Sequence, residues 1–166
     1  ELRAEKEHEK WLKDFKGKSM KVLWLYGVAG VGKTRFAEYL LRNKKYAILG
    51  SSRDYFQDYN GEHYIILNDL RPRDFNYSDL LRILDPYQHD KAAPSRYHDK
   101  KLNAEEIIIT TPYSPDDFYK YIFVDDRRVD TVEQLLRRIQ PLRITKHFIK
   151  KRLKTKKSKQ DDQDNA

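Results

Sequence analysis

A short glycine-rich stretch, GVAGVGKTRF at residues 27–36, lies between an apolar run and a helical pattern. The preceding run, KVLWLY at residues 21–26, is rich in β-branched and aromatic residues and predicts a buried strand. The following FAEYLLRN, at residues 36–43, has apolar residues at helical spacing. A strand, a flexible turn and a helix in this order restrict the chain to folds that alternate strands with helices.

Three further apolar runs have the composition of buried strands. Each is short, nearly continuous and bounded by polar turn residues, as expected of a strand that is covered on both faces in a parallel sheet. They are YAILG at residues 46–50, YIIL at residues 64–67 and IIIT at residues 107–110, and a last strand is expected within residues 142–148.

Helical patterns lie between several of these runs. Leucine and isoleucine recur from about Ser78 to the residue before Pro86, where a helix must end. Ser114 before a proline marks another helix start, and Thr131 with Gln134 has the spacing of a capping box. The whole pattern predicts an α/β fold with a central parallel sheet that is flanked by helices.

The two ends of the chain differ from this pattern. Residues 1–19 are highly charged and predict a short helical segment, which either assists oligomerisation or is a solvated linker. Residues 149–166, basic and then acidic, are too polar to pack and predict a disordered tail. Residues 20–148 remain as one compact domain. Because the sequence begins without methionine, we expect a piece of a longer protein.

Charge and residue usage narrow the classes of partner. The net charge of +8 favours an anionic partner without identifying it. The absence of cysteine excludes disulfides and thiolate metal sites, and the five histidines lack ligand spacing. No apolar run is long enough to cross a membrane, so we expect no membrane partner and a cytoplasmic location.

The glycine-rich stretch fits a phosphate-binding loop, with Gly27, Gly32, Lys33 and Thr34 at the required spacing between strand and helix. Glycines let successive backbone N–H groups face inward, and the following helix directs its positive end at the same point. Lys33 is expected to reach the β- and γ-phosphates of ATP, and the Thr34 hydroxyl to hold Mg²⁺. The alternative is a glycine-rich turn before an ordinary helix. The expected nucleotide-binding residues are Gly27, Val28, Ala29, Gly30, Val31, Gly32, Lys33, Thr34 and Arg35.

Two later segments offer the polar groups that a nucleotide site also needs. Asp69 follows a predicted strand and is expected at the carboxyl edge of the sheet, where it could position the metal and the attacking water. The alternative for Asp69 is an aspartate of a turn. Thr110 and Thr111 end another strand, and their hydroxyls are candidates for sensing the γ-phosphate, although threonine is also a common strand residue.

In their order, these segments resemble the ATPase module of superfamily 3 helicases, as found in rolling-circle replication initiators (Rep proteins) of small plasmids and single-stranded DNA viruses. The bacterial plasmid type is the nearer resemblance, and it implies a bacterial host cell. The similarity spans residues 21–148. It rests on motif A at residues 27–34, motif B at residues 64–75 with LLRILDPY at 80–87, motif C at residues 107–119 and a later basic helix at 132–139.

The resemblance implies an AAA+-like P-loop core that assembles into a ring, usually hexameric, and hydrolyses ATP with Mg²⁺ to move along single-stranded or forked DNA. A family hairpin between motifs B and C implies phosphate contacts, and stacking by Tyr97 or His98. The alternative is a solvated loop. The implied DNA-binding residues are Lys91, Arg96, Tyr97, Lys100 and Lys101.

Arginines of the later helix, Arg137 and Arg138, match the place from which the family supplies a finger to the neighbouring nucleotide, and Arg138 is weakly favoured. Two positions depart from the family. Asn68 replaces the first acid of motif B, and Pro112 replaces the sensor asparagine of motif C, which leaves Thr110 or Thr111 for that role. Both departures put catalytic efficiency in question. The expected catalytic residues are Lys33, Asp69, Thr111, Arg137 and Arg138, with Thr34 and Asp69 at the metal.

Initiators of this family generally begin with an endonuclease domain whose metal is held by a histidine pair. No His-x-His pair occurs here, so we expect no nicking activity and the endonuclease domain to lie outside this chain. Three other functions remain open at this point: a nucleotide-dependent assembly and DNA-binding module with little turnover, an RNA-directed superfamily 3 helicase, and a small phosphotransferase.

Overall fold

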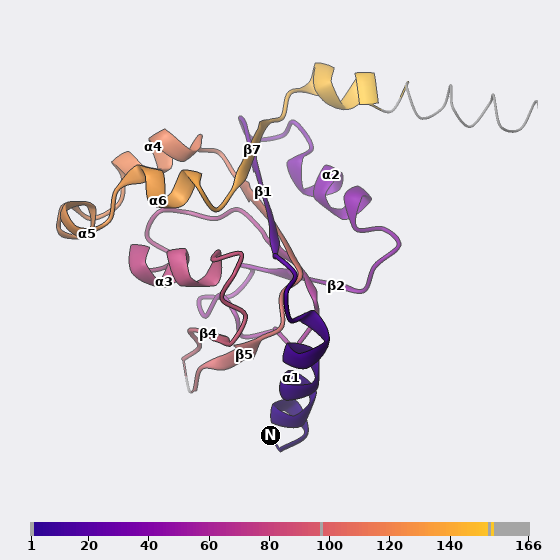
Figure 1. Cartoon of the computed structure of the whole chain (residues 1–166). Coiled ribbons are helices and arrows are strands. Elements are labelled where there is room, and N and C mark those ends of the chain that lie inside the picture. The colour runs from indigo at the N-terminus through magenta and orange to yellow at the C-terminus, as the bar shows by residue number, and fades with distance from the viewer. Residues whose placement is uncertain (1, 97, 153, 155–166) are drawn as a thin grey trace, which may run out of the picture.

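The computed structural model describes residues 2–96, 98–152 and 154, and within them the centre of the fold is a five-stranded sheet (Figure 1). All neighbouring strands are parallel, in the order β2-β3-β6-β1-β7. The predicted α/β class with a central parallel sheet is confirmed. The strands are β1 (Lys21–Tyr26), β2 (Tyr46–Leu49), β3 (Tyr64–Leu67), β6 (Glu106–Thr111) and β7 (Gln140–Arg143).

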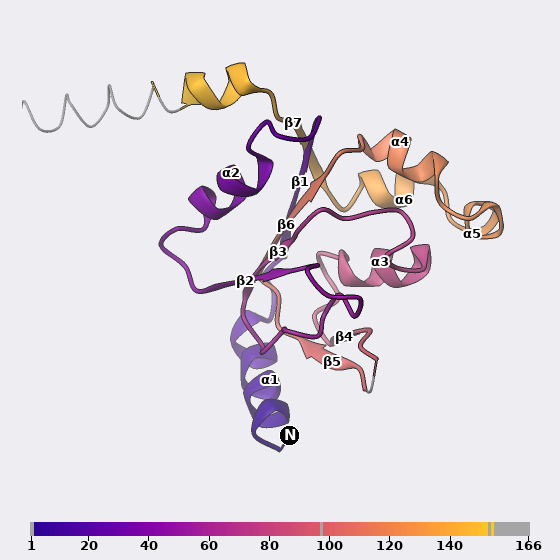
Figure 2. The ribbon, with the colours of Figure 1, turned by 180° about the vertical axis from the view of Figure 1, so that it is seen from behind.

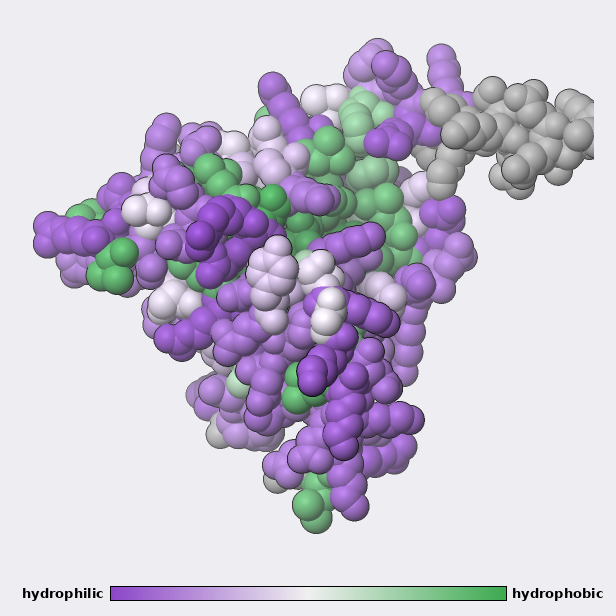
Figure 3. All heavy atoms as spheres, viewed as in Figure 1, coloured by the Kyte–Doolittle hydropathy of each residue, from purple (hydrophilic) through white to green (hydrophobic). Residues whose placement is uncertain are grey.

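Helices cover both faces of this sheet (Figures 1 and 2). One face carries α2 (Lys33–Leu40) and the helical residues 146–152. The opposite face carries α3 (Tyr77–Ile83), α4 (Pro115–Lys120) and α6 (Val132–Leu136). The short α5 (Val124–Val129) buries none of its residues and projects from the body, with exposed Phe123, Val124 and Val129 among hydrophilic neighbours (Figure 3).

The alternation of side chains along each strand divides the apolar residues into two clusters. In β6, Ile107 and Ile109 pack in the cluster under α3, α4 and α6, whereas Ile108 packs in the cluster under α2. In β1, Trp24 and Leu25 separate in the same way. This period of two also sorts polar residues at the strand ends, because successive side chains point to opposite faces of a sheet.

The amino-terminal helix α1 (Leu2–Phe15) is part of the folded unit. Its buried stripe consists of His8, Trp11 and Phe15, and the Trp11 ring stacks on both Phe15 and His63. His8 also contacts Asn103, beside the hairpin of β4 (Lys91–Ala93) and β5 (Lys100–Leu102). Of the two roles expected for residues 1–19, the free solvated linker does not fit this packing.

The carboxyl-terminal part of the structure differs from the prediction. The last strand, β7, ends at Arg143 and so overlaps the expected range of 142–148 at residues 142 and 143, and residues 146–152 form a helix. Ile149 packs in the apolar cluster under α2, and the Phe148 ring meets Phe36 edge to face. A disordered tail that begins at residue 149 therefore does not match the structure, because these apolar side chains anchor the helix. Residues 153 and 155–166, the remainder of the predicted tail, lie outside the described residues.

Lys91, expected to contact DNA phosphate, is instead buried. Its side chain lies in the interior with the residue only 7% exposed, and its ammonium group donates a hydrogen bond of 2.7 Å to the Asp85 carbonyl. The sulfur of Met20 is 3.7 Å from the same nitrogen. Burial lowers the pKa of Lys91 to about 7, since the charged form loses its hydration. The predicted phosphate contact of Lys91 is therefore wrong.

The buried ammonium predicts a specific pH dependence of stability. Between pH 7 and the ordinary lysine pKa of 10.5, the unfolded chain holds a proton on Lys91 that the native chain lacks. Stability from this group thus rises with pH across that window, by up to about 1.4 kcal/mol per unit. The Lys91→Met variant lacks this pH-dependent contribution. The free energy of unfolding of the variant minus that of wild type is therefore expected to be greatest near pH 7 and to fall toward pH 9.5.

Urea unfolding at several pH values between 7 and 9.5 measures this difference, with Lys45→Met, at an exposed lysine, as the matched control. A difference between wild type and Lys91→Met that stays constant over the whole range would contradict the assignment.

Candidate functional site

The loop between β1 and α2 presents backbone donors toward one end of the sheet. Gly30 and Gly32 have positive φ angles of 81° and 97°, which curl the chain just before α2 begins at Lys33. No side chain caps the start of α2 at Gly32. The first N–H groups of this helix are therefore available to an anion, and the helix dipole favours negative charge at the same place.

Gly27, the first residue of the loop, lies against the chain that leaves β7. A Cβ atom at this position would come within 2.4 Å of the Ile144 carbonyl oxygen. Its φ angle of 152° is also one that residues with a side chain rarely adopt. The Ile144 N–H donates to the Tyr26 carbonyl at 2.7 Å, so the two segments are tied together at this point. Only glycine fits at position 27.

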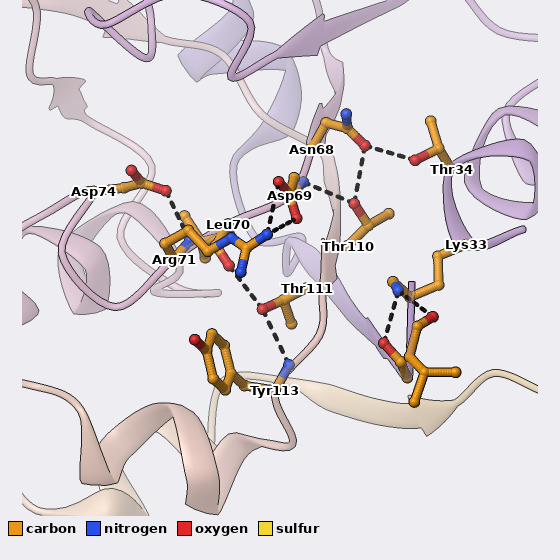
Figure 4. A network of polar contacts seen from close by, with 12 residues as sticks. Lys33, Thr34, Asn68, Asp69, Leu70, Arg71, Asp74, Thr110, Thr111 and Tyr113 are labelled. Atoms are coloured by element: carbon orange, nitrogen blue, oxygen red, sulfur yellow. Dashed lines mark hydrogen bonds and ion pairs between the residues drawn. The ribbon is translucent and has the colours of Figure 1, made fainter. Parts of the chain in front are cut away.

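Lys33 folds back over the loop (Figure 4). Its ammonium group donates to the carbonyls of Gly27 and Val28 at 2.7 and 2.9 Å. Burial lowers the pKa of Lys33, while the neighbouring Asp69 carboxylate opposes that shift and Arg71 adds to it. The ammonium thus sits inside the curl of the loop, where a phosphate group would replace the two carbonyls as its partner.

Asn68 joins the loop to the sheet edge. Its side-chain oxygen accepts one hydrogen bond from the Thr34 hydroxyl at 2.8 Å and another from the Thr110 hydroxyl at 2.9 Å. Thr110 in turn accepts a hydrogen bond from the Asp69 N–H at 2.9 Å. Three segments that are distant in sequence, α2, the end of β3 and the end of β6, are therefore held in one chain of hydrogen bonds (Figure 4).

Asp69, the residue after Asn68, has a left-handed backbone conformation with φ at 53°, which is uncommon for a residue other than glycine. Both of its carboxylate oxygens accept hydrogen bonds from Nη2 of Arg71, at 2.9 and 3.0 Å. These hydrogen bonds raise the pKa of the Arg71 guanidinium, with a smaller contribution from Tyr113. The carboxylate lies at the carboxyl edge of the sheet, as the sequence predicts, but it is paired with an arginine.

These groups line one cavity of about 1270 Å³. Its lining includes the polar groups of Lys33, Thr34, Asn68 and Asp69 and apolar side chains of α2. From residues 146–152 it includes Ile149 together with Lys146, Lys150 and Arg152. Figure 3 shows apolar side chains gathered over α2, beneath the helical residues 146–152. This volume exceeds that of typical small-ligand pockets. The lining residues that carry the argument are Val31, Phe36, Tyr39, Leu40, Leu142 and Ile149.

The two threonines of β6 have different surroundings. Thr110 lines the cavity, while Thr111 is fully buried on the opposite face and donates to the Leu70 carbonyl at 2.7 Å. Strand alternation is the cause, since Thr110 shares its face with Ile108. The structure therefore does not bring Thr111 to the cavity that holds Lys33 and Asp69. Pro112, the residue after Thr111, does line the cavity.

The two candidate finger arginines also differ. Arg138 is held inside the domain, with its side chain 16% exposed, and donates to the Leu81 and Gln134 carbonyls at 3.0 and 2.7 Å. Arg137 is exposed, and within the described part of the chain its side chain hydrogen-bonds only to Gln134 of its own helix, at 2.6 Å. The weakly favoured Arg138 is thus poorly placed to reach a neighbouring subunit, because its guanidinium already fills a structural role.

The β4–β5 hairpin carries the predicted DNA contacts. Its cationic side chains are less uniformly exposed than the sequence suggests. Lys100 donates to the Tyr59 carbonyl at 3.1 Å, so its ammonium is turned toward the protein. Lys101 has a side chain that is half exposed and lies 3.9 Å from Asp90. Arg96 is exposed, and its N–H donates to Asp54 at 2.9 Å. Tyr97 lies outside the described residues.

Sequence reasoning missed Arg71 and the helix at residues 146–152, and it treated Asn68 only as a departure from a motif. The position of Arg71, two residues after the acid of motif B, was the available signal.

Across residues 2–96, 98–152 and 154, no cluster of three or more acidic, histidine or cysteine side chains could hold a metal ion. No helix in the same part of the chain is long and apolar enough to cross a membrane.

The chain is similar in sequence to known helicases and replication proteins. The family model described as RNA helicase matches residues 23–112, which include the loop, Asn68, Asp69 and Thr110. The replication protein of onion yellows phytoplasma (strain OY-M) is 39% identical over 131 residues, covering 76% of this chain and 34% of that protein. The replication-associated protein of canary circovirus is 28% identical over 107 residues, covering 64% of this chain and 34% of that protein. The chain thus spans about a third of the length of these curated relatives.

The close approach at Gly27 predicts a sharp contrast between two glycines of the loop. Gly27→Ala is expected to lose more than about 3 kcal/mol of stability, because its Cβ would overlap a backbone carbonyl that cannot move alone. Gly30→Ala meets nothing within 4 Å, so it carries only the conformational cost of a positive φ, about 1–2 kcal/mol. Chemical unfolding of both variants measures the difference, and equal losses would refute the packing described for Gly27.

Proposed function

We propose that this chain, which belongs to the RNA helicase family and has the superfamily 3 arrangement of motifs, is the ATP-driven motor domain of a replication initiator. The observation that carries the proposal is the convergence of Lys33, Thr34 and Asp69 at one edge of a parallel sheet, beside uncapped N–H groups of α2. Ligands of open α/β sheets bind at this edge. The names of the phytoplasma and circovirus relatives support a role in replication.

ATP would place its phosphates in the loop and its base toward the apolar side chains of α2 that line the cavity. Lys33 would exchange the Gly27 and Val28 carbonyls for phosphate oxygens, which are the stronger partners of an ammonium group. Mg²⁺ would be held by the Thr34 hydroxyl and the Asp69 carboxylate, since oxygen ligands of this kind suit a hard cation. When bound, this ion would neutralise charge on the phosphates.

Hydrolysis would take place between subunits of a homo-oligomeric ring, with a hexamer as the proposed form. The motor would comprise residues 20–152, since the helix at 146–152 packs on α2, with residues 1–19 as the preceding helical segment, in the cytoplasm of a bacterial host. Of the two candidate arginines, exposed Arg137 is the one proposed to reach the neighbouring nucleotide. Thr110, rather than Thr111, is proposed as the hydroxyl that reports on the γ-phosphate, because only Thr110 lines the cavity.

Single-stranded or forked DNA is the proposed track. The net charge of +8 supports an anionic partner. Arg96 and Lys101 on the hairpin are the proposed phosphate contacts among the described residues. Tyr97, which lies outside those residues, is proposed from the sequence as a stacking residue. Competition between single-stranded DNA and RNA distinguishes this track from an RNA-directed motor.

A second function, a nucleotide-dependent assembly and DNA-binding module with little turnover, is favoured by one observation. The residue that accepts the hydrogen bond from Thr34 is Asn68 and not an acid. A single acid, Asp69, is therefore left for both the metal and the water. Measurement of DNA-stimulated ATPase activity together with strand displacement separates the two functions. Oligomerisation on nucleotide without unwinding would support the module.

Lys33→Ala is expected to lower ATPase activity by about a hundredfold or more, because it removes the positive charge that stabilises the developing charge on the phosphates. Lys45→Ala, at an exposed lysine outside the cavity, is the control and is expected to keep wild-type activity. Steady-state phosphate release measures both. Hydrolysis by Lys33→Ala at the wild-type rate would refute the nucleotide site.

Substitutions of Arg137 and Arg138 are expected to have different effects, one on ATPase activity and the other on stability. Arg137→Ala is expected to lower ATPase activity by about a hundredfold or more without changing the unfolding midpoint, because its contacts lie on the surface. Arg138→Ala is expected to lower the unfolding midpoint, because the Leu81 carbonyl loses its partner. Mixing Arg137→Ala with Lys33→Ala subunits tests action between subunits: partial recovery of activity is expected, and no recovery at any ratio would contradict it.

A further inference from the structure

The pairing of Arg71 with Asp69 is the least expected contact of the cavity. One guanidinium nitrogen, Nη2, spans both carboxylate oxygens at 2.9 and 3.0 Å. The acid that the proposed function requires for metal and water is thereby occupied by a side chain of the same loop (Figure 4). Any cation or water that approaches these oxygens must compete with the guanidinium.

The turn that carries Arg71 does not need this guanidinium. The backbone N–H of Arg71 donates to the Asp74 carboxylate at 2.7 Å, and the Asp74 N–H donates to the Arg71 carbonyl at 3.1 Å. The Leu70 N–H donates to the Thr110 carbonyl at 2.8 Å. These three contacts, none of which involves the guanidinium of Arg71, hold the loop in place, and the guanidinium is left for another task.

The location of the pair suggests what that task is. Arg71 lines the same cavity as Lys33, Thr34 and Asp69. Both members of the pair are well exposed, at 49% for the arginine side chain and 61% for the aspartate. An ion pair this exposed contributes little net stability, because water screens it and two side chains must be immobilised. Contact with a phosphate group, which carries more charge and offers several oxygens to a planar guanidinium, is the stronger alternative.

We propose that the Arg71 guanidinium holds Asp69 while no triphosphate is bound and moves to the γ-phosphate when one arrives. This inference rests on the proposed nucleotide site. Arrival of the γ-phosphate would free both oxygens of Asp69 for the metal and the attacking water. ADP lacks the group that attracts Arg71, so the pair would persist with ADP. Asp69 is thereby made available only when there is a bond to hydrolyse.

The test compares Arg71→Gln and Arg71→Lys with Arg73→Gln, which removes an exposed arginine of the same loop. Fluorescent ADP and a fluorescent non-hydrolysable ATP analogue are titrated with Mg²⁺, and kcat and KM for ATP are measured on the same preparations. Arg71→Gln is expected to lose about tenfold in affinity for the ATP analogue, with ADP affinity nearly unchanged, because a single charged hydrogen-bonding partner of the γ-phosphate is removed.

Arg71→Gln is also expected to lower kcat, whereas Arg71→Lys recovers part of the preference for the triphosphate because it restores the charge without the planar guanidinium. Arg73→Gln is expected to match wild type in every measurement. Thermal unfolding of all variants excludes a general loss of structure.

Two outcomes separate this inference from the proposed function. If wild type prefers the ATP analogue and Arg71→Gln keeps the same preference and kcat, the role of Arg71 is refuted while the nucleotide site stands. If wild type binds neither nucleotide, the proposed function fails and the role of Arg71 fails with it.

Discussion

The two hydrogen bonds that Asn68 accepts, from Thr34 and Thr110, connect the phosphate loop to the sheet. Backbone pairing already joins β3 to β6, whereas the hydrogen bond from Thr34 ties the start of α2 to the ends of these strands and fixes the direction of the Thr34 side chain. The contact places the Thr34 hydroxyl beside the sheet edge and leaves the next residue, Asp69, in a left-handed turn. The hydroxyls of Thr34 and Thr110 are thus both positioned by this one amide oxygen. The replacement of an acid by asparagine therefore preserves an acceptor at this position while it removes a charge.

Much of the fold follows from patterns that are local in the sequence. The runs at residues 64–67 and 107–110 became β3 and most of β6, because short apolar segments that are buried on both faces have few other stable arrangements. The glycine-rich loop and the helix start at Ser114 were also predicted from neighbouring residues alone. The Ser114 side chain accepts a hydrogen bond from the Asp117 N–H at 3.2 Å. The same alternation that places Ile108 under α2 determines that Thr110, not Thr111, faces the cavity. That step could have been made from the sequence.

Other features depend on contacts between distant segments and were beyond the sequence. Lys91 and Arg138 read as surface cations, yet both donate to backbone carbonyls near the end of α3, at Asp85 and Leu81 respectively. A carbonyl that lacks a helical partner is an acceptor that composition does not reveal. The helix at residues 146–152 was missed for a similar reason, because its few apolar residues gain a partner only when α2 is folded beside them.

The central claim is that the loop at residues 27–34 binds the phosphates of ATP. A crystal structure of the chain with Mg²⁺ and a non-hydrolysable ATP analogue tests it most directly. We predict phosphates on the backbone N–H groups at the start of α2, the Lys33 ammonium moved from the Gly27 and Val28 carbonyls to phosphate oxygens, and the metal on the Thr34 hydroxyl. A structure in which the analogue binds elsewhere, with Lys33 still on those two carbonyls, would contradict the account.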